Sequence, residues 1–103
     1  MENGFEERRK RNEDKWALDQ ELRFKALVRR NKLIGDWAAA ELGLGGAAAD
    51  AYAREVVAAE IHAGGALGKV PADFTAHGRD PAPVRLKMEE FFRRAQEQVK
   101  AGI

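Results

Sequence analysis

Cysteine and serine are both absent from this chain of 103 residues. Without thiols, the chain has no disulfide, no thiolate nucleophile and no cysteine-ligated metal site. Thr75 is the single threonine, so a hydroxyl nucleophile is nearly excluded as well. The composition therefore argues against a catalytic protein, and it is compatible with a reducing compartment.

Long apolar runs are also missing, since no window approaches the ~20 apolar residues that a helix needs to span a bilayer. The first fifteen residues, MENGFEERRKRNEDK, lack the apolar core of a secretory signal. We therefore expect a soluble cytoplasmic protein with no direct membrane insertion.

Metal and phosphate motifs are weak. The two histidines, His62 and His77, do not assemble a site of three or four ligands with their sequence neighbours, so we expect no metal. The glycines around Lys69 resemble a phosphate-binding loop only superficially. They lack the preceding strand and the Ser or Thr that follows the lysine of a P-loop.

The charge is nearly balanced overall, with a formal net charge of +1, but it is unevenly distributed. Residues 1–32 hold ten of the eighteen Lys and Arg residues against seven acids, and the remainder holds eight cations against ten acids. This pattern indicates a basic N-terminal arm on a mildly acidic body. The balance is too even for strong binding to a nucleic-acid backbone.

The segment from Glu21 to Ala40 combines a helical apolar stripe with a basic cluster. Its apolar residues recur at steps of three or four apart from one gap, which predicts one face entering a core. They are Leu18, Leu22, Ala26, Leu33, Trp37 and Ala40. The cations between them are Arg23, Lys25, Arg29, Arg30 and Lys32. Such a stripe is either a solvated face or a surface for an anionic partner.

Residues 1–15 contain only one large apolar residue, Phe5, so this segment cannot bury enough surface to fold alone. We expect it to be disordered in the isolated protein and to become helical on a partner. Phe5 and Trp16 are eleven residues apart and would share one side of that helix as anchors. The alternative is a solubilising tail, with Trp16 capping the core.

Four helices are predicted, and no segment shows the alternation typical of a strand. They cover residues 14–42, 47–63, 66–77 and 81–101. Pro71 falls inside the third helix, so it either begins that helix or bends it. The buried positions expected on the last three helices are Tyr52, Val56, Val57, Ile61, Leu67, Val70, Phe74, Val84, Met88, Phe91, Phe92, Ala95 and Val99. The fold class is therefore all-α, a four-helix bundle over residues 16–103 with a flexible N-terminal segment.

From the residues alone, two functional classes remain. The chain is either an interaction or regulatory protein whose arm folds on a partner, or a small nucleic-acid binder that uses the basic cluster. The near-neutral balance and the acids within the arm weigh against nucleic acid.

The sequence resembles the zeta subunit family, the small inhibitors of the F-type ATP synthase of alphaproteobacteria. The matching stretches are Phe5 to Arg8, Glu21 to Lys25, Arg29 to Gly35, Trp37 to Ala39 and Ala51 to Val57. The resemblance implies a four-helix bundle and a mobile N-terminal segment that enters a catalytic subunit interface and blocks ATP hydrolysis. The implied inhibitory residues are Phe5, Glu6, Glu7, Arg8, Arg9, Lys10, Arg11, Glu13 and Trp16.

The resemblance also implies that ADP or ATP can bind to the bundle, with no cofactor required. The candidate nucleotide-binding residues are Arg29, Arg30, Lys32, Trp37, Arg85 and Lys87. Trp37 is expected to belong to the core rather than to stack on adenine. The expected partner is the catalytic head of the ATP synthase, and the chain is expected to be a monomer. The alternative is a nucleotide-sensing or adaptor protein with the same fold and another partner.

Overall fold

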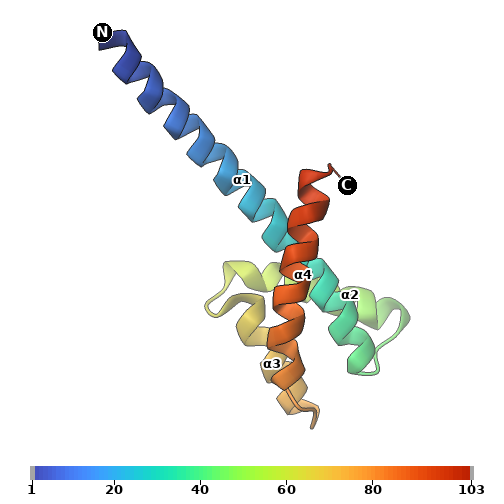
Figure 1. Cartoon of the computed structure of the whole chain (residues 1–103). Coiled ribbons are helices and arrows are strands. Elements are labelled where there is room, and N and C mark those ends of the chain that lie inside the picture. The colour runs from blue at the N-terminus through green and yellow to red at the C-terminus, as the bar shows by residue number, and fades with distance from the viewer. Residues whose placement is uncertain (1, 103) are drawn as a thin grey trace.

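One long helix, α1 (Glu2–Glu41), runs through the first two fifths of the chain and extends well beyond the other helices (Figure 1). The computed structural model describes the backbone of residues 2–102 and the side chains of residues 19–102. At ~1.5 Å per residue such a helix spans about 60 Å. The longest dimension of the molecule, 64 Å, is therefore essentially the length of α1.

α1 begins earlier than the predicted start near Asp14. The physical reason is local, because residues 6–15 are mostly Glu, Arg and Lys, which are good helix formers, and Glu6 and Lys10 form a favourable i,i+4 pair in sequence. The side chains of the implied inhibitory residues, Phe5 to Trp16, lie outside the described residues. That this segment orders only on a partner stays a prediction.

Three shorter helices complete the fold. They are α2 (Gly46–Ala58), α3 (Gly65–Ala76) and α4 (Ala82–Lys100), with a single 3₁₀ turn, η1 (Ala59–Ile61), after α2. No strand occurs in residues 2–102, so the predicted all-α, four-helix class is confirmed. Within the described part of the chain, no helix is both long enough and apolar enough to cross a membrane.

α1 ends where the sequence predicts, at Gly43. This glycine has a φ of +77°, in the left-handed region that ends helices, and its amide donates to the Ala40 carbonyl. The Leu44 amide then donates to the carbonyl of Ala39 at 2.9 Å, which reverses the chain toward α2.

The second and third helices differ in detail from the prediction. The expected helix over residues 47–63 ends at Ala58 and continues as η1, which turns Ile61 out of the core. Ile61 is 81% exposed, so its predicted place in the buried stripe is wrong. Pro71 lies in the middle of α3 and leaves the carbonyl of Leu67 without its helical donor. Leu67 is exposed, which corrects its predicted burial and places this turn near water.

The start of α4 is close to the prediction but shifted by one residue. Pro81 occupies the N-cap position, and Asp80 before it accepts a hydrogen bond from the Ala82 amide at 2.9 Å. The buried stripe of α4 agrees well with the sequence pattern. Its buried members are Val84, Met88, Phe91 and Ala95, with Phe92 and Val99 partly covered.

The core forms around the C-terminal half of α1, which packs against α2 and α4, while α3 packs against η1 and α4. The predicted face of α1 is rotated from the observed one. Leu33 and Trp37 are partly buried and Ala40 is exposed, whereas Ile34 and Ala38 are fully buried. Because helices cover α1 from two directions, its buried surface is wider than a single stripe.

α1 and α2 approach closely at Gly35. A Cβ atom on Gly35 would lie 2.9 Å from the backbone Cα of Ala53, which is closer than real atoms tolerate. This glycine therefore permits a backbone contact that the core depends on. The contact also determines which side of α1 faces α2 and which side faces away from it.

Candidate functional site

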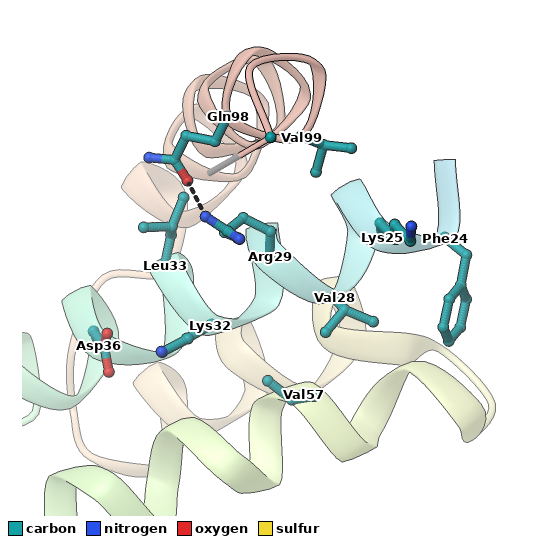
Figure 2. Close-up of a pocket in the computed structure, with 11 residues that line it drawn as sticks. Phe24, Lys25, Val28, Arg29, Lys32, Leu33, Asp36, Val57, Gln98 and Val99 are labelled. Atoms are coloured by element: carbon teal, nitrogen blue, oxygen red, sulfur yellow. Dashed lines mark hydrogen bonds between the residues drawn. The ribbon is translucent and has the colours of Figure 1, made fainter. Parts of the chain in front are cut away.

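A groove along α1 has a volume of about 920 Å³. We call it the α1–α4 groove. Its walls come from α1, from the C-terminal end of α4 and from one residue of α2 (Figure 2). The lining residues are Phe24, Lys25, Val28, Arg29, Lys32, Leu33, Asp36, Val57, Gln98, Val99 and Gly102.

The cations of the groove lie on one face of α1, because Lys25, Arg29 and Lys32 are spaced by four and three residues. The Arg29 guanidinium donates to Gln98 Oε1 at 3.1 Å, which ties α1 to the end of α4 (Figure 2). Lys25 pairs with Glu21 at 3.2 Å, and Lys32 is exposed. Asp36 is the one acid among the lining residues. The groove thus combines a cationic rim with an apolar floor, which suits a ligand that is both anionic and partly apolar.

Arg30 does not join this face, although it follows Arg29 in sequence. Its guanidinium donates to Asn31 Oδ1 at 2.9 and 3.0 Å and lies 3.3 Å from Glu60 Oε2. Asn31, which is fully buried, donates to the same Glu60 oxygen at 3.1 Å. Burial lowers the pKa of Arg30, and the Glu60 charge opposes that shift. This part-buried network connects α1 to η1.

Trp37 belongs to the core. Its ring stacks on Phe74 with a centroid separation of 5.5 Å and an interplanar angle of 21°. Trp37 also packs against the buried cluster that includes Ile34 and Val70. The contact is an offset aromatic pair inside the bundle, so the ring is already engaged on α3.

The remaining two candidates lie at the other end of the bundle. Arg85 of α4 lines a smaller hollow of about 270 Å³, formed by α1, α3 and α4, together with Arg30, Leu67, Met88, Glu89 and Phe92. Lys87 pairs with Glu90 at 3.1 Å and lies over the ring of Phe91. The six candidate nucleotide residues are therefore divided among four places. Only Arg29 and Lys32 share the α1–α4 groove.

Several groove residues were not among the six candidate nucleotide-binding residues. Lys25 belongs to the basic cluster and Phe24 adjoins it, so their neighbourhood in sequence was a usable signal. Val57 and Gln98 come from α2 and α4, and only the packing of those helices brings them to α1. Among residues 19–102, no three His, Cys, Asp or Glu side chains gather in a way that could hold a metal ion.

Comparison with known proteins agrees with the sequence resemblance. The family model described as ATPase inhibitor subunit zeta matches residues 1–98. No curated protein and no solved structure matched the chain. The family match spans α1, α2 and α3 and nearly all of α4, so it covers the projecting half of α1 as well as the helices that form the groove. The chain belongs to the ATPase inhibitor subunit zeta family.

Proposed function

We propose that this protein is a non-catalytic regulator that inhibits ATP hydrolysis by the F-type ATP synthase. Its N-terminal segment, residues 1–15, enters an interface between catalytic subunits and blocks the rotary cycle. The single observation that carries the proposal is the family match over residues 1–98, which includes this segment. The partner is the catalytic head on the cytoplasmic side, so the protein is peripheral to the membrane and acts as a monomer.

The shape of α1 supports this mechanism. The helix continues from the bundle core toward the N-terminus without interruption, and the backbone of residues 2–18 projects beyond the other helices (Figure 1). A helix wedged between two subunits stops them from changing their relative arrangement, and no chemistry is required. The bundle would lie at the entrance of the cleft. Any contact that it makes there raises the effective concentration of the N-terminal segment.

Removal of residues 1–16 tests the proposal directly. The truncated chain should lose all inhibition of ATP hydrolysis by the purified catalytic head, whereas the full chain inhibits. The bundle should remain folded, because its core residues, such as Ile34 and Val70, lie well outside the deleted segment. Circular dichroism and thermal unfolding provide the control. Equal inhibition by both chains contradicts the insertion mechanism, and no inhibition by either favours the alternative of a nucleotide-sensing or adaptor protein.

We also propose that ADP or ATP binds in the α1–α4 groove. The supporting observation is that Arg29 and Lys32 lie on the same groove face, close to the apolar residues Leu33 and Val57. Cations on one face suit phosphates, and a volume of about 920 Å³ is within the range of small-molecule sites. Trp37 is not part of this arrangement, because its ring already stacks on Phe74.

Titration with ADP and with ATP, followed by backbone amide shifts, tests the nucleotide site. We expect the largest shifts around Arg29 and Lys32 and in the last turn of α4. Lys32→Gln should weaken binding several-fold, because it removes one phosphate partner from an exposed position. Residues near Arg85 serve as the internal control, because Arg85 lies in the first turn of α4, at the opposite end of that helix from Gln98. Shifts confined to Arg85, Met88 and Glu89 would assign the nucleotide to the smaller hollow instead.

A further inference from the structure

Phe24 is the one aromatic residue that is exposed among residues 19–102, with 60% of its surface accessible. A single exposed apolar side chain is ordinary on a protein surface. Here, however, Phe24 lines the α1–α4 groove beside Val28 and Val99, which are only partly buried. Phe24, Val28 and Val99 together extend the apolar floor of the groove toward the projecting half of α1. We call Phe24, Lys25 and Val28 the root surface.

The charge around the root surface is mostly positive along α1, with acids only at its two ends, Glu21 and Asp36. From Leu22 to Gly35 the helix carries five cations and no acid. Lys25 pairs with Glu21 at 3.2 Å, and its side chain is 57% exposed, so the ammonium stays accessible to a partner. An apolar strip with a cationic rim is complementary to a helix that has an apolar face bordered by Asp or Glu. The same surface offers little to a basic or neutral partner.

The position of the root surface determines what it can meet. Phe24 lies about 33 Å from the N-terminal end of α1 at ~1.5 Å per residue. The C-terminal end of α4 lies beside α1 close to the point where α1 leaves the bundle (Figure 1). When the projecting half of α1 enters a cleft, the root surface and the adjacent end of α4 therefore come close to the rim of that cleft.

We propose that the root surface docks an acidic amphipathic helix on the rim of the catalytic head, beside the interface that receives the N-terminal segment. This inference rests on the proposed function, because it assumes that the segment inserts. The bundle is then a second binding element rather than a passive support. Two weak contacts joined by a rigid helix give a combined affinity well above that of either contact.

Two variants of the full chain test the docking surface, Phe24→Ala and Lys25→Glu. Each should weaken inhibition of ATP hydrolysis by about tenfold, seen as a higher concentration for half-inhibition, because one of the two linked contacts is lost. The matched controls are Leu86→Ala and Arg93→Glu. Leu86 is 70% exposed, and both positions lie on the outer side of α4, away from the groove. The controls should inhibit like the unmodified chain.

The outcomes separate the two proposals. If the unmodified chain inhibits and both root variants inhibit equally well, docking is wrong while the inhibitory function stands. If the unmodified chain does not inhibit, the proposed function itself fails. Lys25→Glu places two acids at an i,i+4 spacing with Glu21, which weakens a helix slightly. Lys25→Gln is therefore measured beside it, and circular dichroism confirms that the variants keep their helix content.

Two further measurements identify the chemistry of the partner. The difference between the unmodified chain and Lys25→Glu should narrow as salt rises, because exposed charges are screened. A difference that persists unchanged in high salt contradicts an acidic partner. A photo-reactive phenylalanine analogue in place of Phe24 should cross-link to an acidic helix of the purified head. Cross-linking to a basic segment, or to none, overturns the proposal.

Discussion

Two sides of the same helix differ sharply in the bundled half of α1. On the side against α2, Ile34 and Ala38 have no exposed surface, and Gly35 allows the two backbones to approach closely. On the groove side, Phe24 and Lys25 are mostly exposed. Substitutions on the first side disturb close packing and should destabilise the fold. Substitutions on the second side should leave the fold stable but alter the surface that a partner meets. Stability and binding are therefore separable along one element.

The largest effect should come from removing a fully buried side chain on the packed side. Ile34→Ala deletes methylene and methyl groups that lie in the centre of the core, so we expect a loss of about 3 kcal/mol in the free energy of unfolding. Urea unfolding followed by circular dichroism measures this loss. At low temperature, where the variant is still folded, inhibition of the catalytic head should be unchanged.

Phe24→Ala is the matched change on the groove side. It removes a larger side chain than Ile34→Ala does, yet Phe24 is 60% exposed, so the free energy of unfolding should change by less than about 0.5 kcal/mol. If this variant lost as much stability as Ile34→Ala, the two sides of α1 would not differ as argued. In that case the weakened inhibition expected of Phe24→Ala would be a folding effect.

A pair of glycine substitutions sharpens the comparison at the backbone. The new Cβ in Gly35→Ala would lie 2.9 Å from the Cα of Ala53, so α1 and α2 must move apart. Overpacking costs about 2 kcal/mol and the better helix propensity of alanine returns about 1, which leaves a net loss of about 1 kcal/mol. Thermal unfolding should show a lower midpoint for this variant.

Gly68→Ala is the control for helix propensity alone. Gly68 lies in α3 with a negative φ, and a Cβ there meets no atom within 4 Å. The same substitution should raise the free energy of unfolding by about 0.5 to 1 kcal/mol. Opposite signs at the two positions would demonstrate the close α1–α2 contact. A gain at both positions would show that the helices can separate without cost.

The number of helices and the stripe of α4 were predictable from the sequence because each rests on local pattern. Val84, Met88, Phe91 and Ala95 repeat at helical spacing, and the glycine at position 43 marks an end. The buried face of α1 was less predictable, since two neighbours cover it at once. Asn31 illustrates the difficulty, because a polar residue in that stripe is buried only when a partner such as Glu60 is supplied from η1.

The candidate site could be predicted only in part. The basic run on α1 includes Arg29 and Lys32, which share the groove, and their role in nucleotide binding stays a prediction. It gave no means of separating Arg30 from them, because adjacent residues on a helix point about 100° apart and their partners come from other helices. Val57 and Gln98 entered the groove through tertiary packing alone. The roles of the N-terminal residues stay predictions from the family resemblance.

A smaller effect is expected at the polar contact between α2 and α3, which lies at the edge of the core. The Tyr52 hydroxyl donates to Asp73 Oδ2 at 2.9 Å, and Lys69 pairs with the same carboxylate at 3.0 Å. Tyr52→Phe removes this hydrogen bond and leaves the ring in place. We expect a loss of about 1 kcal/mol in the free energy of unfolding at pH 7. Asp73 keeps Lys69 as a partner, which limits the cost.

The pH dependence of that loss follows from the pKa of Tyr52. Burial, followed by the hydrogen bond to Asp73, raises the pKa of Tyr52 well above its usual value in the folded protein. In the unfolded chain the hydroxyl titrates near pH ~10, so above that pH the unfolded state releases its proton first. The stabilisation is therefore fully present below about pH 10 and declines as the pH rises further. Urea unfolding between pH 7 and 11.5 should show the advantage of the unmodified chain over Tyr52→Phe shrinking above pH ~10. If the difference in the free energy of unfolding stayed constant across that range, the hydroxyl would not be held by the α2–α3 contact. The polar contact would then resemble the exposed groove side of α1 rather than the packed side.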